Sequence, residues 1–457
     1  MFEMVRSRLR VWIGDATLQR LVKNASMLIG AQTIVMFIGM AQYPLVTRML
    51  GPENYGVWSI TISWVGLVSQ ILSFRLWETV IKYLNQFMGV GDESRALAVL
   101  KLVLLIDFSV GVLTFLIVNL SADVAARFVL QSRPDGADLI RLEAFNAFMG
   151  LSMSVWMAVL RVFDRFRLIS IYNVLSSVAL FIFWMAVLAA GAGLPGLILA
   201  SAVVKLGQTI ALGALARREL RRRFRGSWFS ADLSGLKDHR REIWVMLFSM
   251  NLDTFRKMVT ESADILILGW FTAPVQVGLY KLGKQLAFYL NRVFGQFYEV
   301  MYPEIPRLYA SEGPARVRSF IRRVTFGLGA TVLVSVIAAC LFAPPLIPIV
   351  FGPDYVGAIP LFLVLLVSNF WVLLFWAPSL MVTLGKAPQL VLINFAISVA
   401  TLIALLVFTP LWSAYGAAFA SVMNLIAGLV IYMLYFARVP EFEWRRMFLR
   451  HNPVSGG

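Results

Sequence analysis

The sequence has very few of the residues from which metal and nucleophile sites are usually built. Its 457 residues include one cysteine, Cys340, and two histidines, His239 and His451. One cysteine cannot form an internal disulfide, and two histidines beside it are too few for a Cys/His metal cluster. We therefore expect no bound metal and no cofactor.

Charge is also scarce. Only 14% of the residues are charged, against about 25% in ordinary soluble domains, whereas 59% are hydrophobic and the mean hydropathy is +0.77. The N-terminus lacks the uninterrupted apolar core and small-residue cleavage site of a signal peptide. This composition predicts an all-α, polytopic membrane protein.

Apolar runs of about 20 residues mark the predicted membrane spans. We identify twelve, near residues 25–47, 56–80, 97–119, 138–160, 168–190, 194–216, 243–271, 276–302, 321–343, 358–383, 388–409 and 412–436. They leave a basic segment, 217–242, between the sixth and seventh spans. The chain is therefore expected to form about twelve transmembrane helices.

The distribution of basic residues predicts the orientation of these spans. With the N-terminus in the cytoplasm, the outer segments hold only Arg48, Arg127, Arg133 and Arg141 of the 41 lysines and arginines. Since cytoplasmic loops carry the excess of lysine and arginine, both termini are expected to be cytoplasmic. The net charge of +16 is then a topological signal and an attraction to anionic lipid, not a sign of nucleic-acid binding.

Three short matches between the halves predict an internal repeat. Gly56 matches Gly278, Asp164-Arg165 matches Gly385-Lys386, and Gly196 with Ala200-Ser201 matches Gly416 with Ala420-Ser421, at offsets of 220 to 222 residues. We expect two pseudo-symmetric six-helix lobes around a central cavity, because such repeats place the transport path between them. The predicted organisation is a surface segment 1–23, lobes 24–216 and 243–437, a basic cytoplasmic linker 217–242 and a cytoplasmic tail 438–457.

Two neighbouring spans carry charges inside otherwise apolar sequence. In the seventh span, DTFRKMVTESAD (253–264) places Asp253, Arg256, Lys257, Glu261 and Asp264 within an arc of about 140° at 100° per residue. In the eighth, a similar face holds Lys281, Lys284, Gln285, Arg292, Gln296 and Glu299. Charges cannot face lipid cheaply, so both stripes are expected to face a wet interior.

The surplus of base over acid predicts an anionic ligand. Arginine binds phosphate oxygens with a fork of donors and lysine binds them as a point charge. The predicted phosphate ligands are Arg256, Arg292, Lys284, Lys257, Arg75 and Lys281, whereas Asp107, Glu261 and Asp264 could couple an ion. The alternative is that these charges pair with one another and fix the packing of the helices.

A set of ordered motifs gives the sequence a family resemblance. They are LVTRMLGPENYGVWS (45–59), SADILILGWFTAPVQVGLYKLGKQL (262–286), YPEIPRLYA (302–310), IPIVFGPDYVGAIPLFLVLL (347–366) and YGAAFASVMNLIAGLV (415–430). Together they resemble the Wzx-like polysaccharide flippases of the multidrug/oligosaccharidyl-lipid/polysaccharide superfamily. From the residues themselves, Gly51-Pro52 and Gly56 are expected to form the turn between the first two spans.

The resemblance implies a function in surface polysaccharide synthesis. It implies that undecaprenyl-pyrophosphate-linked oligosaccharide repeat units move across the bacterial inner membrane, with membrane lipid and the polysaccharide polymerase and chain-length machinery as further partners. Sugar specificity would come from neutral polar and aromatic side chains, namely Asn173, Asn369, Trp371, Trp376, Asn394 and Asn424.

We do not expect an enzyme, because the longest outer loop, about 120–137, is too short for a folded catalytic domain. Two alternatives remain open at this point. A cation-coupled multidrug exporter of the same superfamily would centre on acidic residues rather than a basic surplus. A lipid II flippase would carry two further C-terminal helices, for which the sequence has no counterpart.

Overall fold

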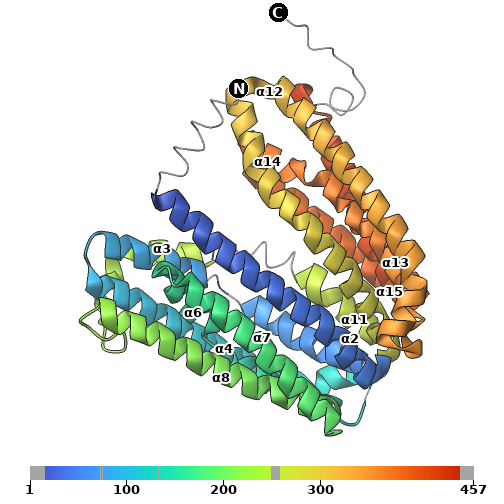
Figure 1. Cartoon of the computed structure of the whole chain (residues 1–457), viewed down its shortest axis with the longest axis horizontal. Coiled ribbons are helices and arrows are strands. Elements are labelled where there is room, and N and C mark those ends of the chain that lie inside the picture. The colour runs from blue at the N-terminus through green and yellow to red at the C-terminus, as the bar shows by residue number, and fades with distance from the viewer. Residues whose placement is uncertain (1–15, 73, 75, 132, 249–257, 443–457) are drawn as a thin grey trace, which may run out of the picture. The chain divides into compact units, whose positions relative to one another are not determined.

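The computed structural model describes residues 16–72, 74, 76–131, 133–248 and 258–442. These residues are almost entirely helical and include no β-strand, so the predicted all-α class is confirmed (Figure 1). The first half of the chain contains α2 (Ala16–Leu72), α3 (Leu76–Gly89), α4 (Glu93–Val129), α5 (Gly136–Met149), α6 (Met153–Val162), α7 (Phe166–Ala189), α8 (Gly193–Arg223), η1 (Leu233–His239) and α9 (Arg240–Phe248).

The second half is built from longer and more irregular helices. Its elements are η2 (Val259–Ala263), α11 (Asp264–Phe271), α12 (Pro274–Phe351), η3 (Pro353–Tyr355), α13 (Ala358–Leu366), η4 (Val367–Leu374), α14 (Trp376–Thr383), α15 (Ala387–Phe436) and η5 (Pro440–Phe442). The element η2 is a π-helix and η4 is a 3₁₀ helix.

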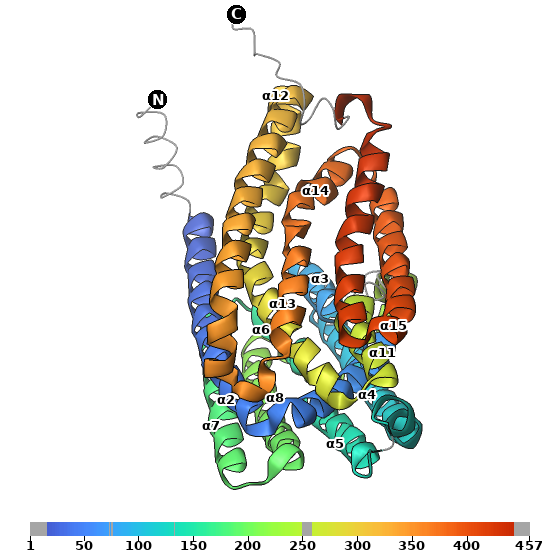
Figure 2. The ribbon, with the colours of Figure 1, turned by 90° about the vertical axis from the view of Figure 1, so that its right-hand side faces the viewer.

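The number of membrane crossings follows from where the long helices turn. Eight helices of the described chain are long and apolar enough to span a membrane. Three of these contain a break, α2 at Gly51, α12 at Gly313 and α15 at Trp412–Ser413. Figure 2 shows that α12 and α15 reverse direction there. Counting each of these three twice gives eleven candidate crossings in the described chain, which agrees with the prediction of about twelve.

Helix-ending turns recur at the spacing of the predicted repeat. Residues with positive φ pair as Gly91 with Gly313, Gln131 with Gly352, Asp164 with Gly385 and Gly193 with Ser413, each pair 220 to 222 residues apart. At Asp164 and at Gly385 the turn is the same in detail, because N–H groups bond back to carbonyls three and five residues earlier in both. The two halves therefore repeat one six-helix pattern.

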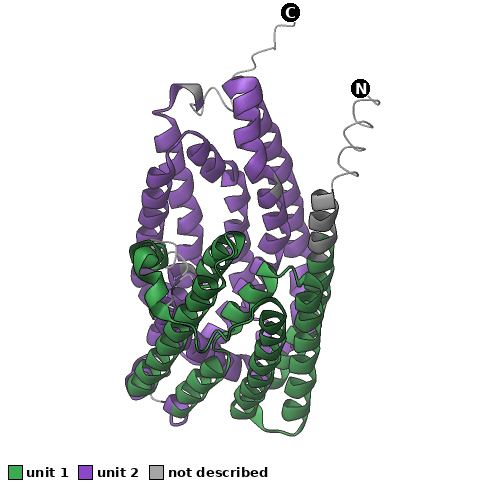
Figure 3. Ribbon diagram, turned by 90° about the vertical axis from the view of Figure 1, so that its left-hand side faces the viewer, with its two compact units in different colours: residues 1–49, 72–122, 138–250 green, residues 50–71, 123–137, 251–457 purple. Residues whose placement is uncertain are grey.

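The compact units of the structure do not coincide with the two halves of the chain. One unit comprises Met1–Met49, Leu72–Ala122 and Asp138–Met250, and the other comprises Leu50–Ile71, Asp123–Ala137 and Asn251–Gly457 (Figure 3). The second unit thus includes two segments from the first half, where α2 turns and where α4 ends. The lobes 24–216 and 243–437 therefore remain a prediction.

The basic segment 217–242 is ordered and packs within the first unit. The helix α8 continues to Arg223, and Phe224 and Leu236 are buried after it. Two cations of α4 bind the backbone of the segment, Lys101 at the carbonyl of Ala231 (2.8 Å) and Arg95 at that of Gly235 (3.1 Å). The segment is therefore anchored to one unit along its length.

The two matched glycines of the repeat contact each other. A Cβ atom on Gly56 would lie 1.8 Å from the carbonyl oxygen of Pro274, and one on Gly278 would lie 1.9 Å from that of Pro52. Neither distance leaves room for a side chain, so the two helix starts touch through their backbones. The prediction of a turn at Gly51 is confirmed by its φ of 72°, whereas the prediction that Gly56 belongs to that turn is wrong, because Gly56 is helical and serves this contact.

Candidate functional site

A cavity of about 710 Å³ lies within the second unit. Its walls come mainly from the first arm of α12, from η4 and from both arms of α15. Single residues of η2, α11, α13 and α14 complete the lining. On α12 the lining residues recur every three or four positions and so occupy one face of the helix; they are Lys284, Ala287, Phe288, Asn291, Gly295, Tyr298 and Tyr302.

A π-helical turn shapes the cavity wall ahead of α11. In a regular α-helix, residues five apart differ by about 140° around the axis. In η2 the hydrogen bonds instead join residues five apart, which brings Val259 and Asp264 to the same side, and both line the cavity. Such π turns occur frequently at functional sites.

A second irregularity shapes the wall contributed by the tenth span. The span changes from α-helix to 3₁₀ helix over Val367–Leu374 and carries Ser368, Asn369 and Trp371 into the cavity. Pro378 accounts for the end of this stretch, because a proline has no N–H to donate to the carbonyl four residues earlier, at Leu374. The polar lining therefore sits where the helix is tighter than usual.

The described lining has one acid and one base, and they pair. Lys284 Nζ donates to Asp264 Oδ2 at 2.5 Å, with 24% of the lysine and 5% of the aspartate side chain exposed. The hydroxyl of the fully buried Tyr280 donates to the same oxygen at 2.6 Å and lies 3.4 Å from Ser421 Oγ. These contacts hold Asp264 as a buried carboxylate whose charge is balanced by Lys284.

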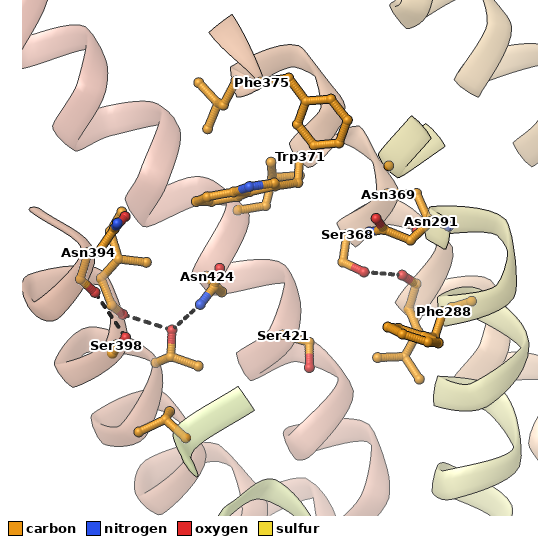
Figure 4. A pocket seen from close by; sticks show the side chains of 18 of the residues that line it. Phe288, Asn291, Ser368, Asn369, Trp371, Phe375, Asn394, Ser398, Ser421 and Asn424 are labelled. Carbon is orange, nitrogen blue, oxygen red and sulfur yellow. Dashed lines mark hydrogen bonds between the residues drawn. The ribbon is translucent and has the colours of Figure 1, made fainter. Parts of the chain in front are cut away.

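The remaining polar groups of the cavity are neutral. Figure 4 shows Asn291 and Asn369 on one side and Asn394 and Asn424 on the other, with Trp371 and Phe375 across one end. Asn424 donates to Thr401 Oγ1 at 2.8 Å, and Asn394 accepts from Tyr432 at 3.3 Å. The amide nitrogen of Asn369 is buried and has no partner among the described residues. Four amides and several aromatic rings thus share one cavity.

Of the predicted phosphate ligands, the cavity includes Lys284. Lys281 is half-buried one turn away on α12, within electrostatic reach of Asp264, and is not part of the lining. Arg292 is exposed on the adjacent face of α12. Arg75, Arg256 and Lys257 lie outside the described residues, so all roles assigned to these six bases stay predictions.

The predicted ion-coupling acids lie in different surroundings. Asp264 is the buried partner of Lys284, whereas Glu261 is exposed in the π turn. Asp107 belongs to the first unit, beside Ser152 at the break between α5 and α6, and one of its carboxylate oxygens is buried without a hydrogen bond in the described chain. Ion coupling by any of the three stays a prediction.

Most of the neutral residues predicted for sugar recognition line the cavity, whereas two of the three described bases do not. Asn369, Trp371, Asn394 and Asn424 all line the cavity. Trp376 is buried nearby against Phe436, and Asn173 lies on α7 of the first unit. Sequence reasoning missed Asn291 and the aromatic residues of α12, because their stripe lies beside the charged stripe on which the prediction rested.

Comparison with known proteins gives one family match. A family model described as "Polysaccharide biosynthesis protein" matches residues 21–309. Among curated proteins, the inner membrane protein YghQ of Escherichia coli K12 is 22% identical to this chain over 371 residues, which are 78% of this chain and 99% of that protein.

Solved structures share the fold at low sequence identity. A MATE family multidrug resistance transporter of the MOP superfamily, in an inward-facing conformation, has a TM-score of 0.70 and 15% identity over 91% of this chain and 98% of that one. The lipid II flippase MurJ in an inward closed conformation has a TM-score of 0.64 and 9% identity, over 91% and 89%. A MOP superfamily transporter from Pyrococcus furiosus has a TM-score of 0.61 and 13% identity, over 94% and 97%. This chain therefore shares the fold of these solved structures.

Proposed function

The chain belongs to the polysaccharide biosynthesis protein family, and we propose on that basis that it moves an undecaprenyl-pyrophosphate-linked oligosaccharide across the bacterial inner membrane. Transport runs from the cytoplasmic to the periplasmic leaflet and supplies repeat units for a surface polysaccharide. A polysaccharide polymerase and its chain-length machinery would act on the product. The transporter fold is consistent with this role.

The composition of the cavity is the observation that supports a sugar ligand. An asparagine amide both donates and accepts hydrogen bonds, which suits sugar hydroxyls that do the same. Aromatic rings offer flat apolar faces to the C–H face of a sugar ring. We infer that the oligosaccharide occupies the cavity of the second unit, with Asn369 donating to one of its oxygens.

The pyrophosphate requires cations beyond those of the cavity. Lys284 is already balanced by Asp264, so the described lining has no surplus positive charge for a phosphate. We propose that the head group is held by the other predicted bases, Lys281 and Arg292 on α12 together with Arg75, Arg256 and Lys257. Arg292 suits this role because its exposed guanidinium has a fork of donors that matches phosphate.

Deleting the gene tests the proposed transport reaction. Cells without this protein are expected to accumulate lipid-linked repeat units on the cytoplasmic leaflet and to lose surface polysaccharide. Extraction of the lipid-linked sugars, combined with an assay of their sidedness, measures the first effect. Normal polysaccharide export in a strain that has no second flippase would show that the substrate is a different one, such as a drug.

Replacing Asn369 with leucine tests the sugar site. The change removes a buried donor without partner, so the heat stability of the protein is expected to stay the same or rise. Export is expected to fall by up to about tenfold, because one hydrogen bond to the substrate is lost. Membrane abundance and complementation of the deletion strain measure the two effects.

The matched control is Asn119→Leu, which makes the same chemical change on α4, where the amide donates to the carbonyl of Phe115. Its export is expected to match that of the unchanged protein at equal abundance. If Asn369→Leu exports as well as Asn119→Leu, the cavity does not bind the oligosaccharide through this amide.

Fusions to reporter enzymes test the predicted orientation. A fusion after residue 230 or 457 is expected to behave as cytoplasmic, and one near residue 132 as periplasmic, because lysine and arginine concentrate on the inner side. Alkaline phosphatase activity of the fusion at 230 would show that the orientation is the opposite of the predicted one.

A further inference from the structure

A cluster of cations lies in the first unit, on residues that do not line the cavity. The start of α7 and the end of α8 lie side by side (Figure 1) and enclose a pocket of about 340 Å³. Four arginines line it, together with Asp164 and Glu219: Arg165 directly before α7, Arg167 in α7, and Arg218 and Arg222 in α8. The pocket therefore has a surplus of positive charge.

A buried carboxylate organises half of this cluster. Glu219 is 3% exposed and accepts from Arg165 Nη2 at 2.7 Å and from Arg222 Nη1 at 3.4 Å. Each guanidinium has five N–H donors, so both arginines keep donors for a further partner. Arg165 Nε is buried and has no hydrogen-bond partner in the described structure.

The other half of the cluster has no protein partner. Arg167 and Arg218 make no hydrogen bond or ion pair with the residues described here, and both are exposed. No side chain caps the N-terminus of α7, whose backbone N–H groups add positive potential at the same place. Guanidinium forks beside free helix N–H groups are suited to the oxygens of a phosphate group.

The helix α7, which starts at the pocket, provides an apolar surface. Four of the 24 residues of α7 are buried. Its exposed side chains include an apolar stripe at helical spacing that starts one turn from Arg167, namely Ile171, Leu175, Val178 and Ile182. A ligand with a phosphate at one end and acyl chains at the other can contact both parts. Basic pockets beside transmembrane helices bind anionic lipid head groups in this way.

We propose that this pocket binds the phosphate group of an anionic phospholipid, with the acyl chains lying along α7. Arg167 and Arg218 supply the unpaired charges, and Glu219 holds Arg165 and Arg222 in place. The site shares no lining residue with the cavity of the second unit, so the proposal does not rest on the transported substrate.

A binding experiment with purified full-length protein in phosphatidylcholine nanodiscs tests this site. Short-chain phosphatidylglycerol is the probe, and native mass spectrometry or a fluorescent analogue reports its binding. The double variant Arg167→Gln/Arg218→Gln is expected to bind about 10- to 30-fold more weakly, given the usual contribution of two basic side chains near an anionic head group. Its folding should be unaffected, because neither side chain has a partner to lose.

The matched control is Arg221→Gln/Arg225→Gln, which removes the same charge from exposed arginines at the same end of α8 that do not line the pocket. It is expected to bind phosphatidylglycerol normally. Equal weakening by both double variants would overturn the proposal in favour of general attraction by the basic surface. Displacement of the lipid by inorganic phosphate at similar concentration would also overturn it, since the pocket would then recognise free phosphate.

Discussion

Replacing Gly278 with alanine is expected to prevent most of the protein from folding in the membrane. The new methyl group would lie 1.9 Å from the carbonyl oxygen of Pro52, and that oxygen belongs to backbone rather than to a side chain that could rotate away. Overpacking a well-packed site costs about 1–3 kcal/mol when side chains can adjust, and here two helix starts must separate. Gly56→Ala is expected to have the same effect, because its Cβ would meet Pro274 at 1.8 Å.

The abundance and heat stability of fluorescent-protein fusions measure this loss. Gly327→Ala is the matched control, since Gly327 lies on the same helix, α12, with no atom within 4 Å of its added Cβ. The control should behave like the unchanged protein. If Gly278→Ala is as abundant and as heat-stable as Gly327→Ala, the backbone contact between the repeats does not hold the fold together.

Replacing Lys284 with methionine is expected to reduce both folding and export strongly. Asp264 would then be a buried carboxylate without its cation, and breaking a buried ion pair from one side costs about 3–5 kcal/mol. Adding Asp264→Asn removes the unpaired charge and keeps an oxygen that can accept from Tyr280. The double variant is therefore expected to recover most of the membrane abundance.

The coupling between the two substitutions is the measured quantity, obtained from the abundance and melting temperature of both single variants and the double variant. Recovery of abundance without export would mean that the charges serve transport as well as packing. A double variant no more stable than Lys284→Met would show that the pair contributes nothing to the fold.

The sequence predicts the membrane spans well because each span needs a long run of apolar residues. Twenty apolar residues are required to cross the hydrocarbon layer, so each span is visible in the composition alone. The matched turns at Asp164 and Gly385 were found for a similar reason, since helix-ending residues leave a recognisable local pattern.

The cavity could be predicted only in part, because its walls are irregular helices. Arcs drawn at 100° per residue assume an α-helix throughout, whereas η2 shifts the register between Val259 and Asp264. Pro378 signals the disturbance that ends near Leu374, and it could have directed attention to Asn369 and Trp371. No comparable signal marks the π turn.

The balance of charge between Asp264 and Lys284 has a consequence for the effect of membrane voltage. A pair of charges that sums to zero gains no energy from moving together through the field, so the described lining of the cavity is not biased toward either face. Each negative charge on a bound lipid pyrophosphate, by contrast, changes energy by about 2.3 kcal/mol per 100 mV. With the cytoplasm negative, the field pushes that charge outward. The charge of the proposed substrate would thus favour outward transport, whereas the pair of Asp264 and Lys284 adds nothing to the voltage dependence.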